Sequence, residues 1–271
     1  MNAINQKNIN REQELYQEYE ELLIRRDQLI KEAGSILIAY TSEFGDMITA
    51  NFELKMDCIR EKKTINYCRR RQNRGLPVDV RTMQAEIERE MHLYKVQLLE
   101  MMQQTELAKQ AETVDEFRLS RSKKLYRRLA KQLHPDINPE TEQNAELKDL
   151  WERIVRAYRA SNVDELEDLE VLVRGALNRL NIEPGAVQID DIEDRIDRVE
   201  RQINDILSTE PYTYKEILLD EAKKEEYRRS LQAEHDDYEE YLAGLKQALQ
   251  EMLTESGCTL VWTTDPGETE Q

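Results

Sequence analysis

His134 and Asp136 are the residues of this 271-residue chain whose side chains could do chemistry at close range, and Pro135 separates them. An imidazole beside a carboxylate could form a catalytic or metal-binding pair. Pro135, however, cannot continue a helix and also disfavours helical dihedral angles at His134. We therefore expect the three residues to form a rigid, exposed turn, which suits presentation to a partner protein better than catalysis.

A strongly basic segment leads into this turn. Its seven basic side chains, with no acidic one among them, are Arg118, Arg121, Lys123, Lys124, Arg127, Arg128 and Lys131, whereas the whole chain has a formal net charge of -17. Leu125, Leu129 and Leu133 recur at every fourth position, which predicts a helix with one apolar stripe and its basic residues facing solvent. A segment whose charge opposes that of its own chain is a candidate docking surface for an acidic partner.

A second amphipathic helix is expected after the turn, running antiparallel to the basic one. It starts in an acid-rich first turn, as the helix dipole favours. Its apolar face consists of Leu147, Leu150, Trp151, Ile154, Ala157 and Tyr158. Ser161 and Asn162 then cap a further helix, and Pro184-Gly185 closes this region.

Together these features resemble the J-domain of the DnaJ family of co-chaperones. The run Lys-Lys-x-Tyr-Arg-Arg-Leu-Ala-x-x-x-His-Pro-Asp-x-Asn-Pro, residues 123–139, matches the family's second helix and loop without a gap. Trp151, Ile154, Ala157 and Tyr158 fall where the family's third helix carries its core residues. The resemblance covers about a quarter of the chain. More loosely, the whole chain is similar to bacterial J-domain proteins with a long helical N-terminal region, which have a counterpart of residues 73–79.

Two features depart from the family pattern. The family's opening motif, which forms a short first helix, is absent upstream of Ser122. We expect residues 113–120 to replace that helix, with Thr113 and Glu116 as a capping box and Val114 and Phe117 as its buried contacts. The segment between Asp136 and Trp151 is also longer than usual.

The resemblance implies a co-chaperone that stimulates ATP hydrolysis by a DnaK-type heat-shock chaperone. The basic helix would dock on the chaperone's acidic nucleotide-binding domain, and the turn would favour hydrolysis. The chaperone-binding residues are then His134, Pro135, Asp136, Lys123, Lys124, Arg127, Arg128 and Lys131. Substitution of His134 or Asp136 should abolish stimulation with little loss of thermal stability. The flanking helices would supply specificity for a client protein whose identity the sequence does not give.

Two alternatives from other classes stay open. The chain could be a helical scaffold or interaction protein that keeps an inactive J-like fold, because a fold alone does not fix a function. The residues 123–131 could also bind DNA in a helix-turn-helix arrangement, but the acidic surroundings disfavour this, since phosphate contacts need a basic surface.

The amino-acid composition limits the possible fold and function classes. With 35% charged and 6% aromatic residues, the chain is typical of long amphipathic helices, so we predict an all-α fold. No apolar run approaches the roughly 20 residues that span a bilayer, and the N-terminus lacks a signal core, which predicts a cytoplasmic protein. Cys58, Cys68 and Cys258 suit neither a disulfide framework nor a zinc site. We find no nucleophile elbow, phosphate-binding loop or His-Glu-x-x-His pair, and expect no enzyme and no cofactor.

Long helices are expected on both sides of the J-like region. Residues 11–32 have a heptad rhythm broken by Arg26 at one seam position and end at Gly34; residues 35–72 and 80–110 follow. These three should pack as a bundle or coiled coil. Residues 189–206 and 227–252 predict an antiparallel hairpin, or a dimerising coiled coil that would make a homo-oligomer. The predicted domains are 1–112, 113–182 (J-domain-like), 183–255 and a tail, 256–271, which starts with the β-prone residues 258–262.

Overall fold

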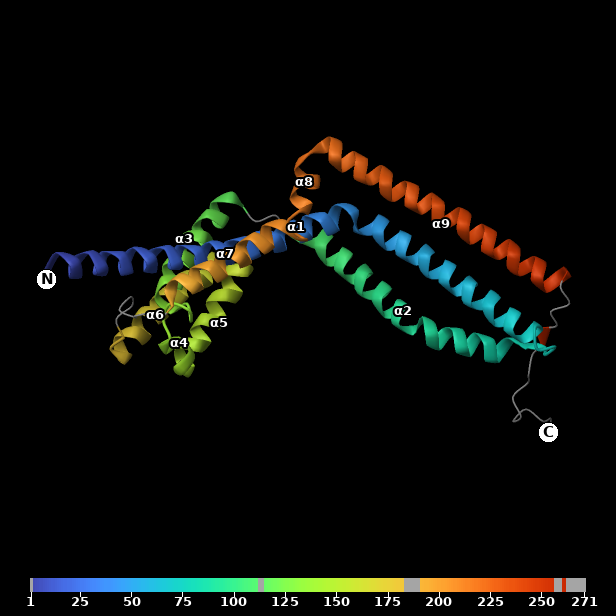
Figure 1. The fold of residues 1–271 in the computed structure, drawn as a ribbon, viewed down its shortest axis with the longest axis horizontal. Helices are drawn as coiled ribbons and strands as arrows, with labels where there is room; N and C mark the ends of the chain where they lie inside the picture. Colours follow the sequence, from blue (N-terminus) through green and yellow to red (C-terminus); the bar gives the residue numbers. More distant parts are fainter. Residues whose placement is uncertain (1, 112–114, 183–190, 256–259, 262–271) are drawn as a thin grey trace. The chain divides into compact units, whose positions relative to one another are not determined.

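The computed structural model describes residues 2–111, 115–182, 191–255 and 260–261, and these residues are almost entirely helical (Figure 1). The predicted all-α class is confirmed. The helices are α1 (Asn2–Gln72), α2 (Val80–Gln110), α3 (Glu116–Leu133), α4 (Glu140–Gln143), α5 (Ala145–Arg159), α6 (Val163–Leu180), α7 (Ile192–Ser208), α8 (Tyr214–Leu219) and α9 (Glu221–Glu255). None of the helices in the described ranges combines the length and apolar composition that crossing a membrane requires.

The first helix, α1, runs without interruption for 71 residues. The prediction of two helices divided at Gly34 is therefore wrong. The first proline of the chain is Pro77, so nothing before it removes a backbone donor. Buried Ala33 and Ile36 continue the apolar face past Gly34, and their packing outweighs the roughly 1 kcal/mol that glycine costs in a helix. The helix ends before Gly75, whose φ of +63° suits a residue without a Cβ.

The contacts of the chain fall into two units. Unit 1 consists of residues 1–37 and 112–214, and unit 2 consists of residues 38–111 and 215–271. Helix α1 contributes its N-terminal part to unit 1 and the rest to unit 2. The two units do not follow the boundaries of the four predicted domains, so those domain ranges stay a prediction.

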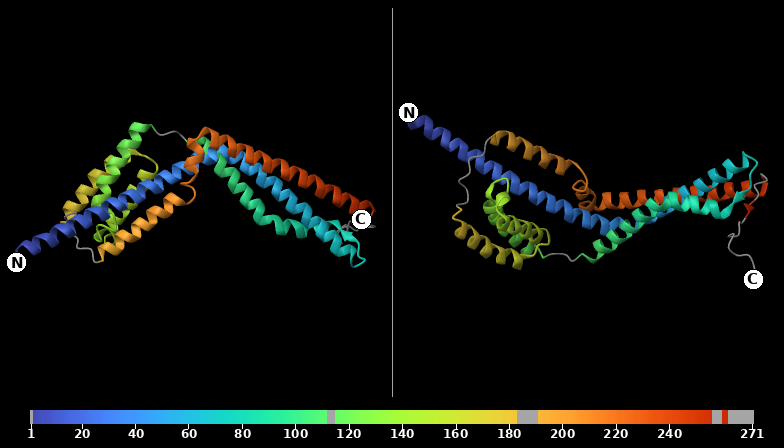
Figure 2. Two further views of the ribbon diagram at one scale, coloured as in Figure 1. Left: turned by 45° about the horizontal axis from the view of Figure 1, so that its top comes forward. Right: turned by 90° about the horizontal axis from the view of Figure 1, so that it is seen from below.

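Unit 1 is built around two apolar clusters. In the first, α3, α5 and α6 bury leucines and isoleucines such as Leu129, Ile154 and Leu169, and Ile24 of α1 joins them. In the second, Tyr19 and Leu23 of α1 pack against Ile196, Val199 and Ile203 of α7. Both views of Figure 2 show the N-terminal part of α1 between α7 on one side and the group of α3 to α6 on the other.

Unit 2 joins the rest of α1 to α2 and α9. The cluster between α1 and α2 contains Met83, Ile87 and Met91, the face that the periodicity of α2 predicted as core, and also the buried Cys68. On the α9 side, the Asn51 side chain donates to the Leu231 carbonyl at 2.9 Å. Strands β1 (Val78–Asp79) and β2 (Leu260–Val261) pair in parallel, so part of the predicted β-prone segment does form a strand. The rest of the predicted tail lies outside the described residues.

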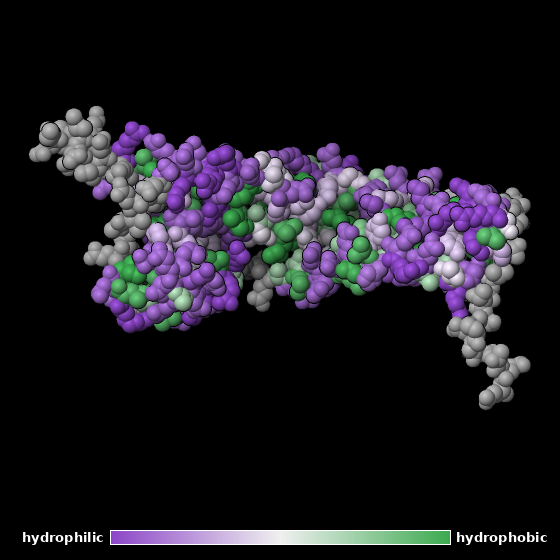
Figure 3. Space-filling model, turned by 60° about the horizontal axis from the view of Figure 1, so that its bottom comes forward, coloured by the Kyte–Doolittle hydropathy of each residue, from purple (hydrophilic) through white to green (hydrophobic). Residues whose placement is uncertain are grey.

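The predicted hairpin of residues 189–206 and 227–252 is wrong. Residues 192–206 and 227–252 are helical, but the apolar face of α7 packs on α1 in unit 1, while α9 belongs to unit 2. Sequence periodicity shows that a helix has an apolar face, but not which helix covers it. The surface seen in Figure 3 is mainly hydrophilic with separate apolar patches, as expected for a chain with 35% charged residues.

Two glycines of α1 give a matched test of this description. A Cβ added at Gly34 would have no atom within 4 Å, whereas one at Gly45 would lie 2.6 Å from the Thr105 Oγ1 atom of α2. We predict that Gly34→Ala raises the free energy of unfolding by about 0.5–1 kcal/mol, and that Gly45→Ala lowers it by about 1–3 kcal/mol through overpacking.

Urea unfolding followed by circular dichroism measures both effects. Adding Thr105→Ala should restore much of the loss in Gly45→Ala, because the clash is with that side chain. A destabilised Gly34→Ala variant would show instead that α1 ends at this glycine.

Candidate partner-binding site at the His-Pro-Asp turn

The turn between α3 and α4 is fixed by its own backbone and side chains. Helix α3 ends at Leu133, as Pro135 predicts, and His134 has extended dihedral angles. The His134 carbonyl accepts from the N–H groups of Ile137 at 2.9 Å and Asn138 at 2.7 Å. The Asn138 side chain donates back to the Gln132 carbonyl at 2.9 Å. The predicted rigid turn is therefore confirmed.

Exposure of the turn differs from the prediction. The Asp136 side chain is 46% exposed, but His134 retains only 4% of its accessible surface and Pro135 is partly buried. The His134 ring packs edge-on against Trp151, with 4.9 Å between ring centroids. The predicted exposure is wrong for His134, because α1 covers the imidazole.

Asp27 of α1 contacts both the turn and α3. Its Oδ2 atom accepts from the Tyr126 hydroxyl at 2.6 Å and lies 3.5 Å from the His134 Nε2 atom. Its Oδ1 atom accepts from the Arg26 guanidinium at 2.9 Å. Burial alone would raise the pKa of Asp27, but the His134 hydrogen bond, the Arg26 charge and the Tyr126 hydroxyl outweigh it and hold that pKa below its ordinary value.

These contacts engage both ring nitrogens of His134. Its Nδ1 atom accepts from the Asp136 backbone N–H at 3.1 Å. Its Nε2 atom lies 3.3 Å from the Arg26 Nη2 atom and 3.5 Å from the Asp27 Oδ2 atom. Among the residues that the structure describes, no group of His, Cys, Asp and Glu side chains could hold a metal ion.

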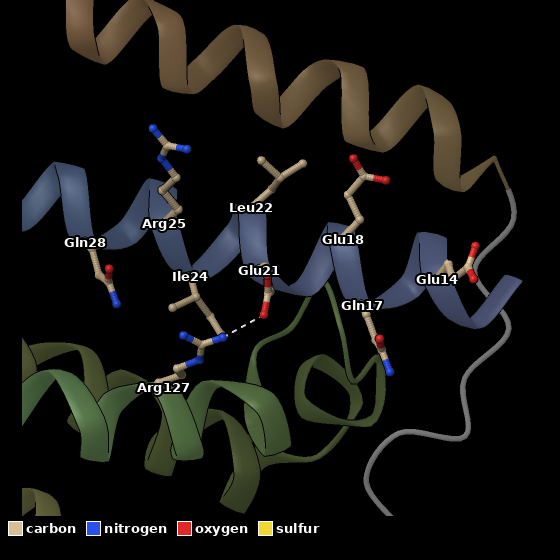
Figure 4. Close-up of a pocket in the computed structure, with 9 residues that line it drawn as sticks. All are labelled: Glu14, Gln17, Glu18, Glu21, Leu22, Ile24, Arg25, Gln28 and Arg127. Carbon is tan, nitrogen blue, oxygen red and sulfur yellow. Dashed lines mark hydrogen bonds and ion pairs between the residues drawn. The ribbon is translucent and has the colours of Figure 1, made fainter. Parts of the chain in front are cut away.

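The basic side chains of α3 divide into three sets. Arg118, Arg121 and Arg128 form ion pairs with Asp164, Glu167 and Glu170 of α6. On the opposite side, Arg127 pairs with Glu21 of α1 at 2.8 Å, and Lys131 pairs with the buried Glu20. Figure 4 shows the Arg127 guanidinium and the Glu21 carboxylate directed toward each other.

Lys123 and Lys124 make up the third set. Both are exposed, and neither forms an ion pair within the described residues. The predicted solvent-facing position is confirmed for these two lysines and for the four arginines, which are exposed although they are paired with acidic residues of the chain itself, while Lys131 is partly buried.

A depression of about 360 Å³ lies beside the turn. Its lining residues include Lys31 of α1, and Trp151 and Tyr158 of α5. The Lys31 Nζ atom lies 4.0 Å from the Tyr158 ring centroid and donates to Ser122 at 3.2 Å. Burial, followed by the charge of Lys123, lowers the pKa of Lys31 to about 8.

The expected replacement for the missing first helix is not observed. Residues 116–120 are the first turns of α3, and Phe117 is 76% exposed, so it supplies no buried contact. Thr113 and Val114 lie outside the described residues. Helix α1 covers the α3–α5 pair instead. The sequence held one signal for this arrangement, because Arg26 interrupts the seam of α1, and a charge at a seam position indicates a polar partner.

No protein-family model, curated protein or solved structure matches this chain in the comparisons.

The pKa of Asp27 gives a testable pH dependence. A carboxylate whose pKa is lowered by folding contributes stability above its ordinary pKa of 3.8, and this contribution is lost as the pH falls through the folded-state value. Asp27→Asn cannot ionise. We predict that it costs about 1–3 kcal/mol at neutral pH and that its stability changes less than that of the unmodified chain below about pH 4.

Denaturant unfolding at a series of pH values checks this prediction, with Asp168→Asn on the exposed side of α6 as the matched control. Parallel pH curves for the unmodified chain and Asp27→Asn would contradict it.

Proposed function

We propose that this chain is a co-chaperone that stimulates the ATPase of a DnaK-type heat-shock chaperone, with no catalytic chemistry of its own. The observation that carries the proposal is the His-Pro-Asp sequence in a rigid turn that connects the basic helix α3 to the antiparallel helix α5. The sequence resemblance to the J-domain supplies the function, and the helix pair with its own apolar cluster supports it.

The chemistry of this face suits a transient acidic partner. Lys123 and Lys124 are exposed on α3 and form no ion pair within the described residues, and Asp136 in the turn leaves its side chain half-exposed for polar contacts. Exposed opposite charges on two proteins accelerate their encounter and add little to the lifetime of the complex. A co-chaperone must bind and leave repeatedly, so such contacts fit that role. Helices α2, α7 and α9 would then contribute contacts to a client.

A specific observation favours a second candidate. His134 is buried, and two of the five proposed docking cations pair with α1, as expected for a helical scaffold in which the J-like fold has become inactive. The two candidates differ in one measurable property, namely stimulation of a chaperone ATPase.

We predict that Asp136→Asn abolishes this stimulation and changes the free energy of unfolding by less than about 0.5 kcal/mol, because its side chain is largely in solvent. His134→Gln should abolish stimulation as well, but with a loss of about 1–3 kcal/mol, because it disturbs a buried hydrogen-bond network. Single-turnover ATP hydrolysis by a DnaK-type chaperone, measured beside urea unfolding, tests both statements.

Asp149→Asn, which makes the same chemical change at an exposed position of α5, is the matched control and should stimulate normally. If the unmodified chain and every variant fail to stimulate ATP hydrolysis, the scaffold function replaces the co-chaperone function as the proposal.

The exposed lysines generate a separate prediction. Lys123→Glu with Lys124→Glu should slow association with the chaperone and flatten its salt dependence without unfolding the chain, because both side chains face solvent. Stopped-flow binding at several salt concentrations measures this effect. Lys223→Glu with Lys224→Glu on α9 alters the net charge by the same amount. Equal slowing by the two double variants would place the docking surface outside α3.

A further inference from the structure

Helix α1 presents one continuous face to α3. Glu20, Ile24, Asp27 and Lys31 follow spacings of four, three and four residues, so they lie on one side of the helix. They meet α3 in reverse order along its length: Glu20 pairs with Lys131, Asp27 accepts from Tyr126, and Lys31 donates to Ser122. The two segments are therefore packed antiparallel.

The contacts on this face are mainly polar. Ile24 is the α1 residue that joins the apolar cluster of α3, α5 and α6, and Ile137 of the turn packs with the cluster of Tyr19 and Leu23. The remaining contacts are ion pairs and hydrogen bonds. The apolar seam of α1 is directed to α7 instead, and Figure 4 shows Leu22 on the α7 side of the helix and Ile24 on the α3 side.

The residues that α1 occupies coincide with the proposed docking surface. Glu20 and Glu21 neutralise Lys131 and Arg127, and the Asp27 Oδ2 atom lies 3.5 Å from the His134 Nε2 atom. These acidic groups sit where an acidic chaperone surface would have to place its own carboxylates. The segment is thus an intramolecular ligand with the chemistry expected of the partner.

We propose that residues 19–31 of α1 and the chaperone compete for the same face of α3, so that this segment, here called the α1 latch, must leave before the full docking surface forms. The inference rests on the proposed function and identifies the partner as a surface that offers carboxylates to Arg127, Lys131 and the turn. Lys123 and Lys124 stay open in the latched state and allow a first encounter, after which the chaperone displaces the α1 latch.

The proposal is tested by weakening the α1 latch in the full chain. Glu20→Lys with Glu21→Lys places positive charges against Lys131 and Arg127. We expect an apparent Kd for the chaperone about tenfold lower, which is the gain when the competent fraction rises from about one tenth to nearly all molecules. The control is Glu14→Lys with Glu18→Lys, which makes the same charge change on α1 at residues that form no hydrogen bond or ion pair with α3 within the described part of the chain, and it should leave the Kd unchanged.

A second readout detects opening without the chaperone. Trp151 shares its depression with Arg26 and Asp27 of α1, so release of the α1 latch exposes its ring. Acrylamide quenching of Trp151 fluorescence, in a chain carrying Trp262→Phe, should increase in Glu20→Lys with Glu21→Lys and stay constant in the control. Circular dichroism establishes that both variants remain helical.

The reverse experiment closes the α1 latch covalently. Cysteines that replace Glu21 and Arg127, whose charged groups are 2.8 Å apart, can be joined by a short bismaleimide in a chain with Cys258→Ser. Because Arg127→Cys removes one docking cation, the reference is the stimulation that the Glu21→Cys, Arg127→Cys protein shows before linkage, and linkage should abolish that remaining stimulation.

The outcomes separate the two proposals. If stimulation depends on Asp136 but does not change with the charge reversals or with the linker, the α1 latch proposal is contradicted. Helix α1 is then a permanent part of the domain. An equal drop in Kd for the Glu14 and Glu18 control would also overturn it, in favour of general charge steering. Failure of every variant to stimulate, with Trp151 exposed in the charge-reversed chain, would overturn the proposed function instead.

Discussion

Asp27 carries a carboxylate into a largely buried position, and three elements of unit 1 supply the groups that compensate its charge: Arg26 from α1, Tyr126 from α3 and His134 from the turn. A buried charge costs several kcal/mol unless it is paired and hydrogen-bonded. The partners can meet at one point only if α1 lies along α3 in this register. The need to satisfy one carboxylate therefore fixes both the position of α1 and the orientation of the imidazole.

The sequence predicts best what is local. The bounds of α2, the end of α3 before Pro135 and the apolar face of α5 all follow from periodicity and from single breaker residues. Gly34 was the failure among these local rules, because its small effect on helix propensity was outweighed by the buried residues on each side of it.

What the sequence could not give is the pairing of segments distant in the chain. Nothing in the pattern of α7 distinguishes α9 from α1 as its partner, since both offer apolar stripes. His134 was expected in solvent because a proline turn is normally exposed, and its burial depends on Asp27, which is 107 residues earlier by numbering. Arg26 was the available clue. A charge that interrupts an apolar seam has a cost that the fold must offset, and here a polar contact to another helix does so.

The order of these segments along the chain also matters during synthesis. Glu20 precedes Lys131 by 111 residues, so at roughly 5–20 residues per second the ribosome completes the acidic part of α1 several seconds before the basic helix emerges. A newly made segment with seven cations appears next to ribosomal RNA, a dense polyanion that attracts basic surfaces regardless of sequence. Because the acidic helix is already present, α3 has an intramolecular partner for its charges from the moment it leaves the exit tunnel.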